Sequence, residues 1–380
     1  MKRTVLSAFF GITLMSSCCF SQENHPMHYQ QTYDKAQTKL ITPTTSPSVD
    51  RGVDVFISGS VIYWNSRLGD FNVVQSGHSI RDSESNFSNL IETDVRTSVG
   101  DNGSHSSSND LGFKAKVGIA LEHDGWDSFI EYTWLRPKTT DHFKDDTFTS
   151  TMDHFRGIPF DHNVADFSSG TSEWKLHFNS ALWELGRSFF ISPKLILRPH
   201  FGLKGVWTTQ RFELQENDLQ VRSELLGAII TGSYLVKQRQ TYWGVGPRAG
   251  FNTSWQLSKN FSIVSIWGIT PLWGNFEAKR NDFLTSVDQE LDIFNIRLDT
   301  LNNEVVKMSF KNHNVNMAYD YQIGFRGDAW FDDDNYRIRI QITWEQQLLS
   351  NFNQFIYIEK TKPTDDLAFQ GVTAELRFDF

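Results

Sequence analysis

Apolar and polar residues alternate along about ten separate segments of this chain, and this alternation restricts the fold more than any other feature. In residues 111–121, Leu111, Phe113 and Val117 face one way, whereas Lys114 and Lys116 face the other. A period of two places successive side chains on opposite faces of a β-strand, whereas a helix needs a period of 3.6 residues. The pattern therefore predicts an all-β protein.

The alternating segments occur without any long apolar run. No segment beyond the N-terminus contains the roughly 18 consecutive apolar residues that a transmembrane helix requires. Alternating strands suit a soluble β-sandwich as well as a membrane barrel. Strands that cross a bilayer have to close into a barrel, because lipid offers no hydrogen bonds to an open sheet edge.

Aromatic residues favour the membrane barrel over the sandwich. They form 14% of the chain, and several tryptophans fall near predicted strand ends, where their rings suit the headgroup level. The last residue, Phe380, resembles the terminal assembly signal of outer-membrane barrels, so the barrel-assembly machinery is a predicted partner. Pro199 and Pro247 are expected near strand ends or bulges, because each removes a ladder donor. The tryptophans are Trp64, Trp126, Trp134, Trp174, Trp207, Trp255, Trp273 and Trp344.

The sequence thus predicts an antiparallel transmembrane β-barrel of about ten strands, with short periplasmic turns and long extracellular loops. A hairpin around Asn302-Asn303 would either stand above the barrel or add two strands, which leaves twelve or more open. Residues 219–235 are expected to form a short helix or a hairpin. The short links fall at 123–125, 188–194, 256–260 and 327–334, and the long links at 65–110, 137–172, 210–239, 275–311 and 347–369.

The N-terminus has the features of an export signal. Lys2 and Arg3 precede a short apolar core, which predicts a signal peptide over residues 1–21. Residues 22–50 are expected to form a flexible periplasmic segment, and residues 51–380 the outer-membrane barrel. Both cysteines, Cys18 and Cys19, lie at the end of the signal. Cleavage after residue 21 would remove them, whereas cleavage before either one would allow lipidation.

Under the barrel interpretation, the polar face of each strand lines the lumen. The charged residues on this face have a modest basic excess, which in an open pore would favour anions. The alternative is a ladder of cross-strand ion pairs that fills the lumen, because barrels of this size are close to those that side chains fill. The candidate lumen-lining residues are Lys114, Lys116, Glu131, Lys175, Arg198, Lys204, Arg248, Asp320, Arg326, Arg337, Arg339, Glu345, Glu375 and Arg377.

The sequence contains no clear catalytic constellation. The pairs His123-Asp124 and Asp141-His142 lie in a predicted turn and loop, and Asp332-Asp333-Asp334 lacks the remaining spacing of a calcium loop. Neither a nucleophile elbow nor a phosphate-binding loop nor a His-x-x-x-His pair is present. We therefore expect no enzyme activity, no cofactor and no metal site. The net charge of −9 argues against a nucleic-acid partner.

Three stretches carry a resemblance to a known family. They are residues 123–134, residues 185–207 with Leu197-Arg198-Pro199-His200-Phe201-Gly202-Leu203 at their centre, and Gly244-Val245-Gly246-Pro247-Arg248. Together they resemble the Legionella-type and chlamydia-like major outer-membrane proteins, with loop gaps, from about residue 52 to the end. The resemblance implies a pore-forming barrel of the outer membrane. The disulfide cross-links of cysteine-rich chlamydial relatives are not expected here.

The leading functional hypothesis is a porin-like channel for passive diffusion of small hydrophilic solutes or ions. The alternative is a non-conducting barrel that serves as a surface structural protein or adhesin through its long loops. A barrel enzyme such as a lipase is a third, weaker hypothesis. Outer-membrane lipid is an expected partner, and a homo-oligomer is left open.

Overall fold

The computed structural model describes most of the chain after residue 53. The described residues are 54–69, 74–76, 109–121, 125–150, 164–223, 228–258, 260–286, 290–291, 296–297, 303–332, 335–356 and 365–380. The predicted signal peptide, the predicted segment 22–50 and both cysteines lie outside them. Within these residues we find no helix of the length and apolar character needed to cross a membrane.

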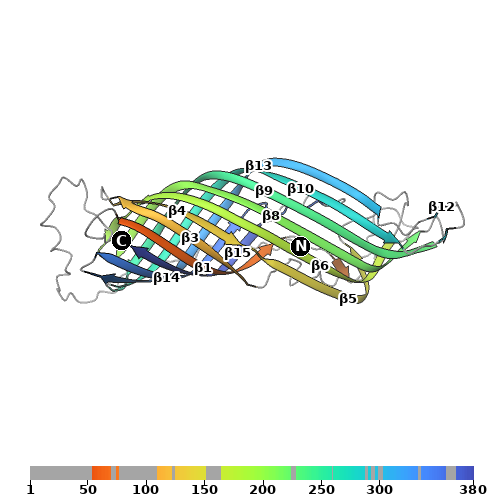
Figure 1. Ribbon diagram of the computed structural model, residues 1–380, viewed down its shortest axis with the longest axis horizontal. Coiled ribbons are helices and arrows are strands. Elements are labelled where there is room, and N and C mark those ends of the chain that lie inside the picture. The colour runs from red at the N-terminus through yellow and green to blue at the C-terminus, as the bar shows by residue number, and fades with distance from the viewer. Residues whose placement is uncertain are drawn as a thin grey trace, which may run out of the picture. The chain divides into compact units, whose positions relative to one another are not determined.

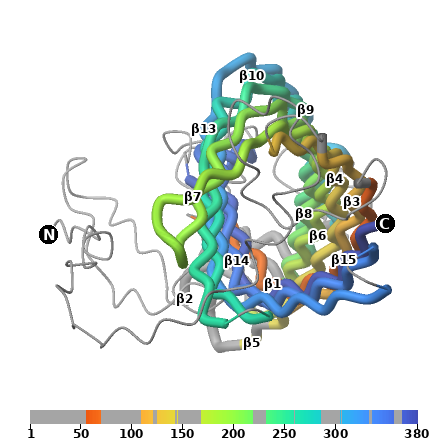
Figure 2. The backbone as a smooth tube through the Cα atoms, turned by 90° about the vertical axis from the view of Figure 1, so that its left-hand side faces the viewer, coloured from red at the N-terminus to blue at the C-terminus, as the bar shows by residue number. Residues whose placement is uncertain are grey.

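Ten antiparallel strands close into one barrel (Figures 1 and 2). Around the ring they are β6 (Val164–Arg187), β4 (Trp126–Leu135), β3 (Asp110–Leu121), β1 (Asp54–Leu68), β15 (Leu367–Asp379), β14 (Tyr336–Leu349), β13 (Asn303–Phe331), β10 (Phe261–Ser286), β9 (Ala228–Gln256) and β8 (Leu195–Ser223). The ring closes where β8 pairs with β6, and the first and last strands pair directly, with Ile57 opposite Phe378. The predicted barrel of about ten strands is confirmed.

The remaining strands add no member to this ring. After Arg136 and Pro137, β5 (Lys138–Ser150) continues the course of β4 along β6, and β7 (Phe189–Ser192) continues β6 along β8. β2 (Val74–Ser76) pairs with β5. β11 (Glu290–Leu291) and β12 (Ile296–Arg297) form a separate two-stranded ladder.

Four strands are much longer than a bilayer requires. β8, β9, β10 and β13 contain 26 to 29 residues, whereas about 9–11 residues span the hydrocarbon core. β8 and β9 stay paired as far as Ser223 and Ala228. The hairpin expected at 219–235 is therefore confirmed, but the long loop expected at 210–239 is wrong, because most of that link is strand.

The expected hairpin around Asn302-Asn303 is also wrong. Val306, Met308 and Phe310 extend β13 and pair with β10, whereas Ile296 pairs with Leu291 of β11. The alternation of Val306, Met308 and Phe310 does correspond to a strand, but the partner of a strand is not determined by its own pattern.

Pro247 lies in the middle of β9, not at a strand end or bulge as expected. The β9–β10 ladder runs to Ile269 opposite Ala249 and resumes in the same register at Trp273 opposite Val245. This register brings Pro247 level with Pro271, so both missing N–H donors fall in one short gap of the ladder. Pro199 does lie near the periplasmic end of its strand.

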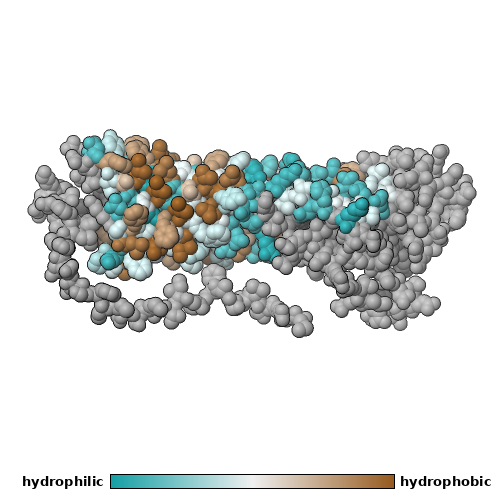
Figure 3. Space-filling view, turned by 90° about the horizontal axis from the view of Figure 1, so that it is seen from below, coloured by the Kyte–Doolittle hydropathy of each residue, from teal (hydrophilic) through white to brown (hydrophobic). Residues whose placement is uncertain are grey.

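The outer surface of the barrel has two zones. On β9 the outward residues from Trp255 to Trp243 are mainly apolar, and this stretch measures roughly 40 Å along the strand. At a tilt of about 45° it spans roughly 30 Å, which matches a bilayer core. Beyond Trp243 the outward residues are Thr241, Arg239 and Lys237. Figure 3 shows this division, with apolar residues toward the C-terminal end and hydrophilic residues toward the other.

The inner surface also changes polarity near the level of Trp243, but in the opposite sense. On the side of the short turns the inward residues are polar. On the side of the long strand extensions they form a buried apolar core, which we call the distal core. Trp64 and Trp174 belong to this core, so the prediction that they lie at the headgroup level is wrong. The distal core comprises Ile62, Trp64, Leu68, Leu135, Trp174, Leu176, Phe178, Val206, Phe212, Leu214, Tyr234, Val236, Tyr242, Leu272, Phe276, Ala318, Leu349, Phe352, Phe355, Leu367 and Phe369.

Candidate functional site: the lumen

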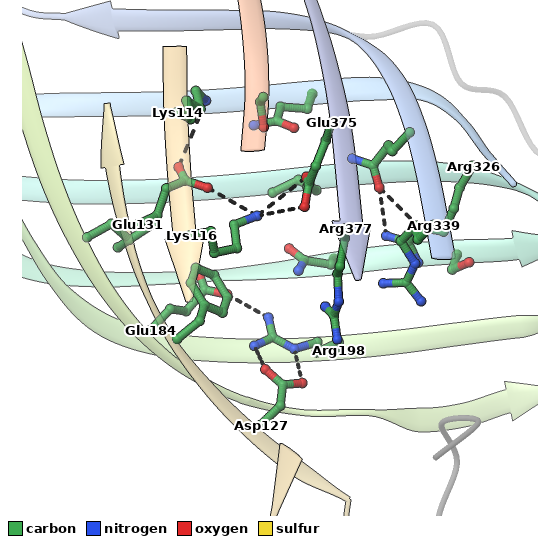
Figure 4. Close-up of a pocket in the computed structure, with 18 of the residues that line it drawn as sticks. Lys114, Lys116, Asp127, Glu131, Glu184, Arg198, Arg326, Arg339, Glu375 and Arg377 are labelled. Carbon is green, nitrogen blue, oxygen red and sulfur yellow. Dashed lines mark hydrogen bonds and ion pairs between the residues drawn. The ribbon is translucent and has the colours of Figure 1, made fainter. Parts of the chain in front are cut away.

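The membrane-spanning half of the barrel encloses a polar cavity of about 420 Å³. Thirteen of the fourteen candidate residues line it, and Figure 4 shows several of them pointing toward one another from different strands. The cavity extends from Gly125, Ser188 and Gln256 at the short turns to Glu345 and Gln347 below the distal core. It therefore reaches the periplasmic rim at one end and meets apolar side chains at the other.

Lys175 is the candidate that the structure places elsewhere. Its side chain is 41% exposed on the outside of β6 and forms an ion pair with Glu173, while Trp174 and Leu176 point inward. Hydrogen bonds from Lys138 and Lys175 hold the pKa of Glu173 below its usual value. The prediction that Lys175 lines the lumen is wrong. This part of β6 lies beyond the apolar zone of the outer surface, which is the membrane zone, and outside that zone the apolar face of the strand points inward.

Two lysines of β3 are held at the upper end of the cavity. Lys114 Nζ lies 2.5 Å from Glu345 Oε1, and Lys116 Nζ lies 3.1 Å from Glu131 Oε2 and 3.4 Å from Glu375 Oε1. Thr373 donates to the second oxygen of Glu345 at 2.8 Å. These residues come from β3, β4, β14 and β15, so the network ties four strands together inside the barrel.

A second network joins β4, β6 and β8. Arg198 forms ion pairs with Asp127 and with Glu184, the latter at 2.6 Å. Gly186 makes room for this guanidinium, because a Cβ at that position would overlap it.

Asp320 is the centre of a third group of charges. It accepts from Lys204 Nζ at 2.7 Å and also pairs with Arg248. Gly268 leaves the space that the Arg248 guanidinium occupies. All three charged side chains are buried. Loss of one partner would therefore leave a charge without compensation in a region of low dielectric constant.

The periplasmic end of the cavity is rich in arginine. Arg337 pairs with Asp379 at 2.6 Å, and Arg377 shares that carboxylate at 2.5 Å. Arg339 pairs with Asp328 at 2.8 Å. These charges come from β13, β14 and β15, which are adjacent in the barrel.

The charges along the cavity nearly balance, which changes the electrostatic expectation. Its lining contains nine basic and eight acidic side chains, rather than the basic excess read from the sequence. Sequence reasoning missed Glu184 and Asp328. Glu184 had a usable signal, because it alternates in phase with Leu182 inside an otherwise apolar stretch. The arrangement corresponds to the predicted alternative of a cross-strand ion-pair ladder.

Above the cavity, residues 350–356 fold into the barrel between β14 and β15, and we call them the inward segment. Phe352 lies with its ring centroid 4.6 Å from Tyr242 and 5.3 Å from Phe276, and Phe355 packs on Phe212. All of these rings are buried. The segment thus completes an apolar layer across the lumen.

Side chains of the wall hold the backbone of the inward segment. Gln210 and Gln240 donate to the Phe352 carbonyl, and Gln238 accepts from the Ile356 N–H at 2.8 Å. Arg280 donates to the Ile356 carbonyl at 2.9 Å. Buried backbone groups need such partners, so this path is a specified part of the fold.

The described part of the chain offers no group of three or more His, Cys, Asp or Glu residues that could bind a metal ion. Asp332 has a positive φ of 54° at its turn, and the neighbouring Asp333 and Asp334 lie outside the described residues. The charged groups of the lumen instead bind one another.

No curated protein matches the sequence. The outer membrane protease OmpT from Escherichia coli is similar with a TM-score of 0.37 and 11% identity, covering 89% of this chain and 99% of that one. A Pseudomonas aeruginosa FadL homologue has a TM-score of 0.26 and 7% identity over 86% of this chain and 90% of its own. The toluene transporter TodX of P. putida has 0.24 and 9%, with coverage of 88% and 92%.

The family of this chain is identified by a match of its sequence to a family model. A family model described as the Legionella pneumophila major outer membrane protein precursor matches residues 45–380, which include every strand of the barrel. This agrees with the resemblance seen in the sequence and with the apolar zone around the barrel. The chain belongs to the Legionella major outer membrane protein family and is a β-barrel of the outer membrane.

Proposed function

We propose that this protein is a non-conducting barrel that serves as a structural protein of the cell surface. The observation that carries the proposal is the apolar layer across the lumen, completed by Phe352 and Phe355 of the inward segment. Hydrophobic constrictions stop ion flow because water leaves them. A hydrated ion would also have to lose its water to cross a layer of buried aromatic rings.

The long strands support a role at the surface. On β9, residues 228–242 lie beyond the membrane zone and extend roughly 50 Å along the strand. From Ser233 to Tyr242 the outward side chains are mostly polar, and the inward side chains are buried and either apolar or glutamine. The barrel therefore continues outside the bilayer as a packed, water-exposed column. Such a column can hold the extracellular loops well above the lipid.

A porin-like channel is the second candidate, and one observation favours it. The seal is completed by a segment of a connection rather than by wall residues alone, and a polar cavity already occupies the membrane half. Displacement of the inward segment would remove Phe352 and Phe355 from the layer. Small hydrophilic solutes or ions would then be the permeant species, with weak charge selectivity because the lining charges nearly balance.

Planar bilayers separate the two proposals. Folded wild-type protein should insert without conductance steps at any voltage that the bilayer tolerates. A variant with residues 352–356 replaced by glycine and serine should conduct if the inward segment is the seal. Steps from the wild-type protein would overturn the non-conducting barrel and support the channel. In that case, Arg337→Glu with Arg339→Glu should move the reversal potential toward cation selectivity.

A further inference from the structure

The cavity contains a group of arginines that its own carboxylates do not balance. Four guanidiniums, those of Arg326, Arg337, Arg339 and Arg377, lie at its periplasmic end and share two aspartates, Asp328 and Asp379. The next inward carboxylate on β15, Glu375, lies 3.4 Å from Lys116, which also pairs with Glu131 at 3.1 Å. The four guanidiniums therefore exceed their carboxylates by two charges when Glu375 is left out of the count, and by one when it is included.

The strand register places three of these arginines close together. Arg339 lies directly opposite Arg377 in the β14–β15 ladder. Arg326 lies opposite Gln341 in the β13–β14 ladder, two residues along the same face of β14 from Arg339. Residues directly opposite one another have Cβ atoms about 4.5–5.5 Å apart, and like charges in that position destabilise a sheet. The fold thus maintains a repulsive arrangement inside the barrel.

Arg326 is the least compensated of the four. Its Nε and Nη2 atoms both donate to one acceptor, Gln341 Oε1, at 3.0 and 2.9 Å. Among the residues that the structure describes, no carboxylate lies within ion-pair distance of it. Figure 4 shows Arg326 and Arg339 side by side, with Arg377 nearby on the same wall of the cavity.

We propose that Arg326, Arg339 and Arg377 form a binding site for a small dianionic oxyanion that enters from the periplasm, namely phosphate or a phosphate monoester. Guanidiniums bind phosphate oxygens in pairs of parallel hydrogen bonds. A phosphate group would offset this excess of positive charge, and the cavity of about 420 Å³ has room for it. The site does not depend on whether the barrel conducts.

The test is a binding titration on the folded full-length chain in detergent. Inorganic phosphate and glycerol 3-phosphate are titrated at about pH 8, where a phosphate group carries close to two charges. Calorimetry or ³¹P NMR reports binding, with chloride at equal ionic strength as the monoanion control. Binding of both probes assigns the site to a phosphate group in general, and binding of inorganic phosphate alone restricts it to the free ion.

Variants locate the site. Arg326→Gln and Arg377→Gln should each raise the Kd for phosphate about tenfold or more, because each removes a charge-assisted contact. Lys175→Gln removes the same charge from the outer surface and should bind as the wild type does. Arg326→Lys keeps the charge and guards against loss of folding, so it should retain measurable binding. The proposal fails if wild-type protein shows no saturable binding of either probe, or if Arg326→Gln binds phosphate as tightly as the wild type.

Discussion

The side chain of Gln240 binds the backbone around Phe352 as a strand partner would. Its Nε2 donates to the Phe352 carbonyl at 2.7 Å, and its Oε1 accepts from the Gln354 N–H at 2.9 Å. One amide group therefore satisfies two buried backbone groups of the inward segment. Because the contacts involve only backbone atoms of the segment, they fix its path without depending on its side chains.

Gln240→Leu should loosen the inward segment. The change leaves one buried N–H without its partner and removes one of the two donors to the Phe352 carbonyl, and each unsatisfied group costs about 1–3 kcal/mol. We expect a lower denaturant midpoint and faster amide hydrogen exchange at Gln354. Arg239→Leu, one residue away on the outer surface, is the matched control and should leave both values unchanged.

The reversal of polarity predicts opposite tolerances for neighbouring residues. Val236→Asp puts a carboxylate into the distal core, where Val236 is fully buried, and should prevent stable folding or cost several kcal/mol. Lys237→Asp changes the outer, water-exposed face and should shift stability by less than about 0.5 kcal/mol. Unfolding in guanidinium, followed by the heat-dependent mobility of the folded barrel, measures both. Equal effects would contradict the assigned faces.

Val245 provides the reverse case. It faces outward within the apolar zone and is 44% exposed, so lipid surrounds it in the membrane. Val245→Asp should therefore reduce membrane assembly, although the same change on an exposed surface of a soluble protein would be mild. Thr241→Asp lies beyond Trp243 on the same face and should assemble normally.

Cysteine labelling can map the bilayer boundary. The chain has two cysteines, and in a background with both replaced by serine, single cysteines are placed at Ile340 and at Arg239. A water-soluble maleimide should label the Arg239→Cys variant in liposomes and leave the Ile340→Cys variant unlabelled, because Ile340 faces lipid. Full labelling of both positions would show that the apolar zone is not embedded.

Asp320→Asn should be among the most damaging conservative changes in the lumen. It removes the shared carboxylate from Lys204 and Arg248, and a buried charge that loses its partner costs about 3–5 kcal/mol. The equilibrium unfolding midpoint reports the loss. Adding Lys204→Met removes one of the two uncompensated charges, so the double variant should recover part of the stability.

Sequence patterns predicted the architecture well because alternation shows which residues share one face of a strand. Alternation does not show which of the two faces points into the barrel. For Trp174 and Lys175 the period was right and the direction wrong, since the apolar face of β6 turns inward once the strand leaves the bilayer. For Lys204 and Arg248, which lie at membrane depth, the same reasoning placed the side chains correctly.

The inward segment and the arginine group lay beyond sequence reasoning for different reasons. Residues 350–356 have no periodicity, and their partners, Gln210, Gln240 and Arg280, are distant in the chain. The arginines were recognised individually. Their clustering follows from the register that sets Arg339 opposite Arg377, and register depends on pairing between strands, which one segment alone does not specify.

The pairing of β1 with β15 has a consequence for assembly. Ile62, Trp64 and Leu68 on β1 and Leu367 and Phe369 on β15 belong to the distal core, so part of their apolar surface leaves water when these two strands pair. Sealing the wall is therefore driven partly by expulsion of water at a site that no lipid touches. In such a barrel the apolar core outside the bilayer contributes to the free energy of closing the wall, and a longer column should increase that contribution.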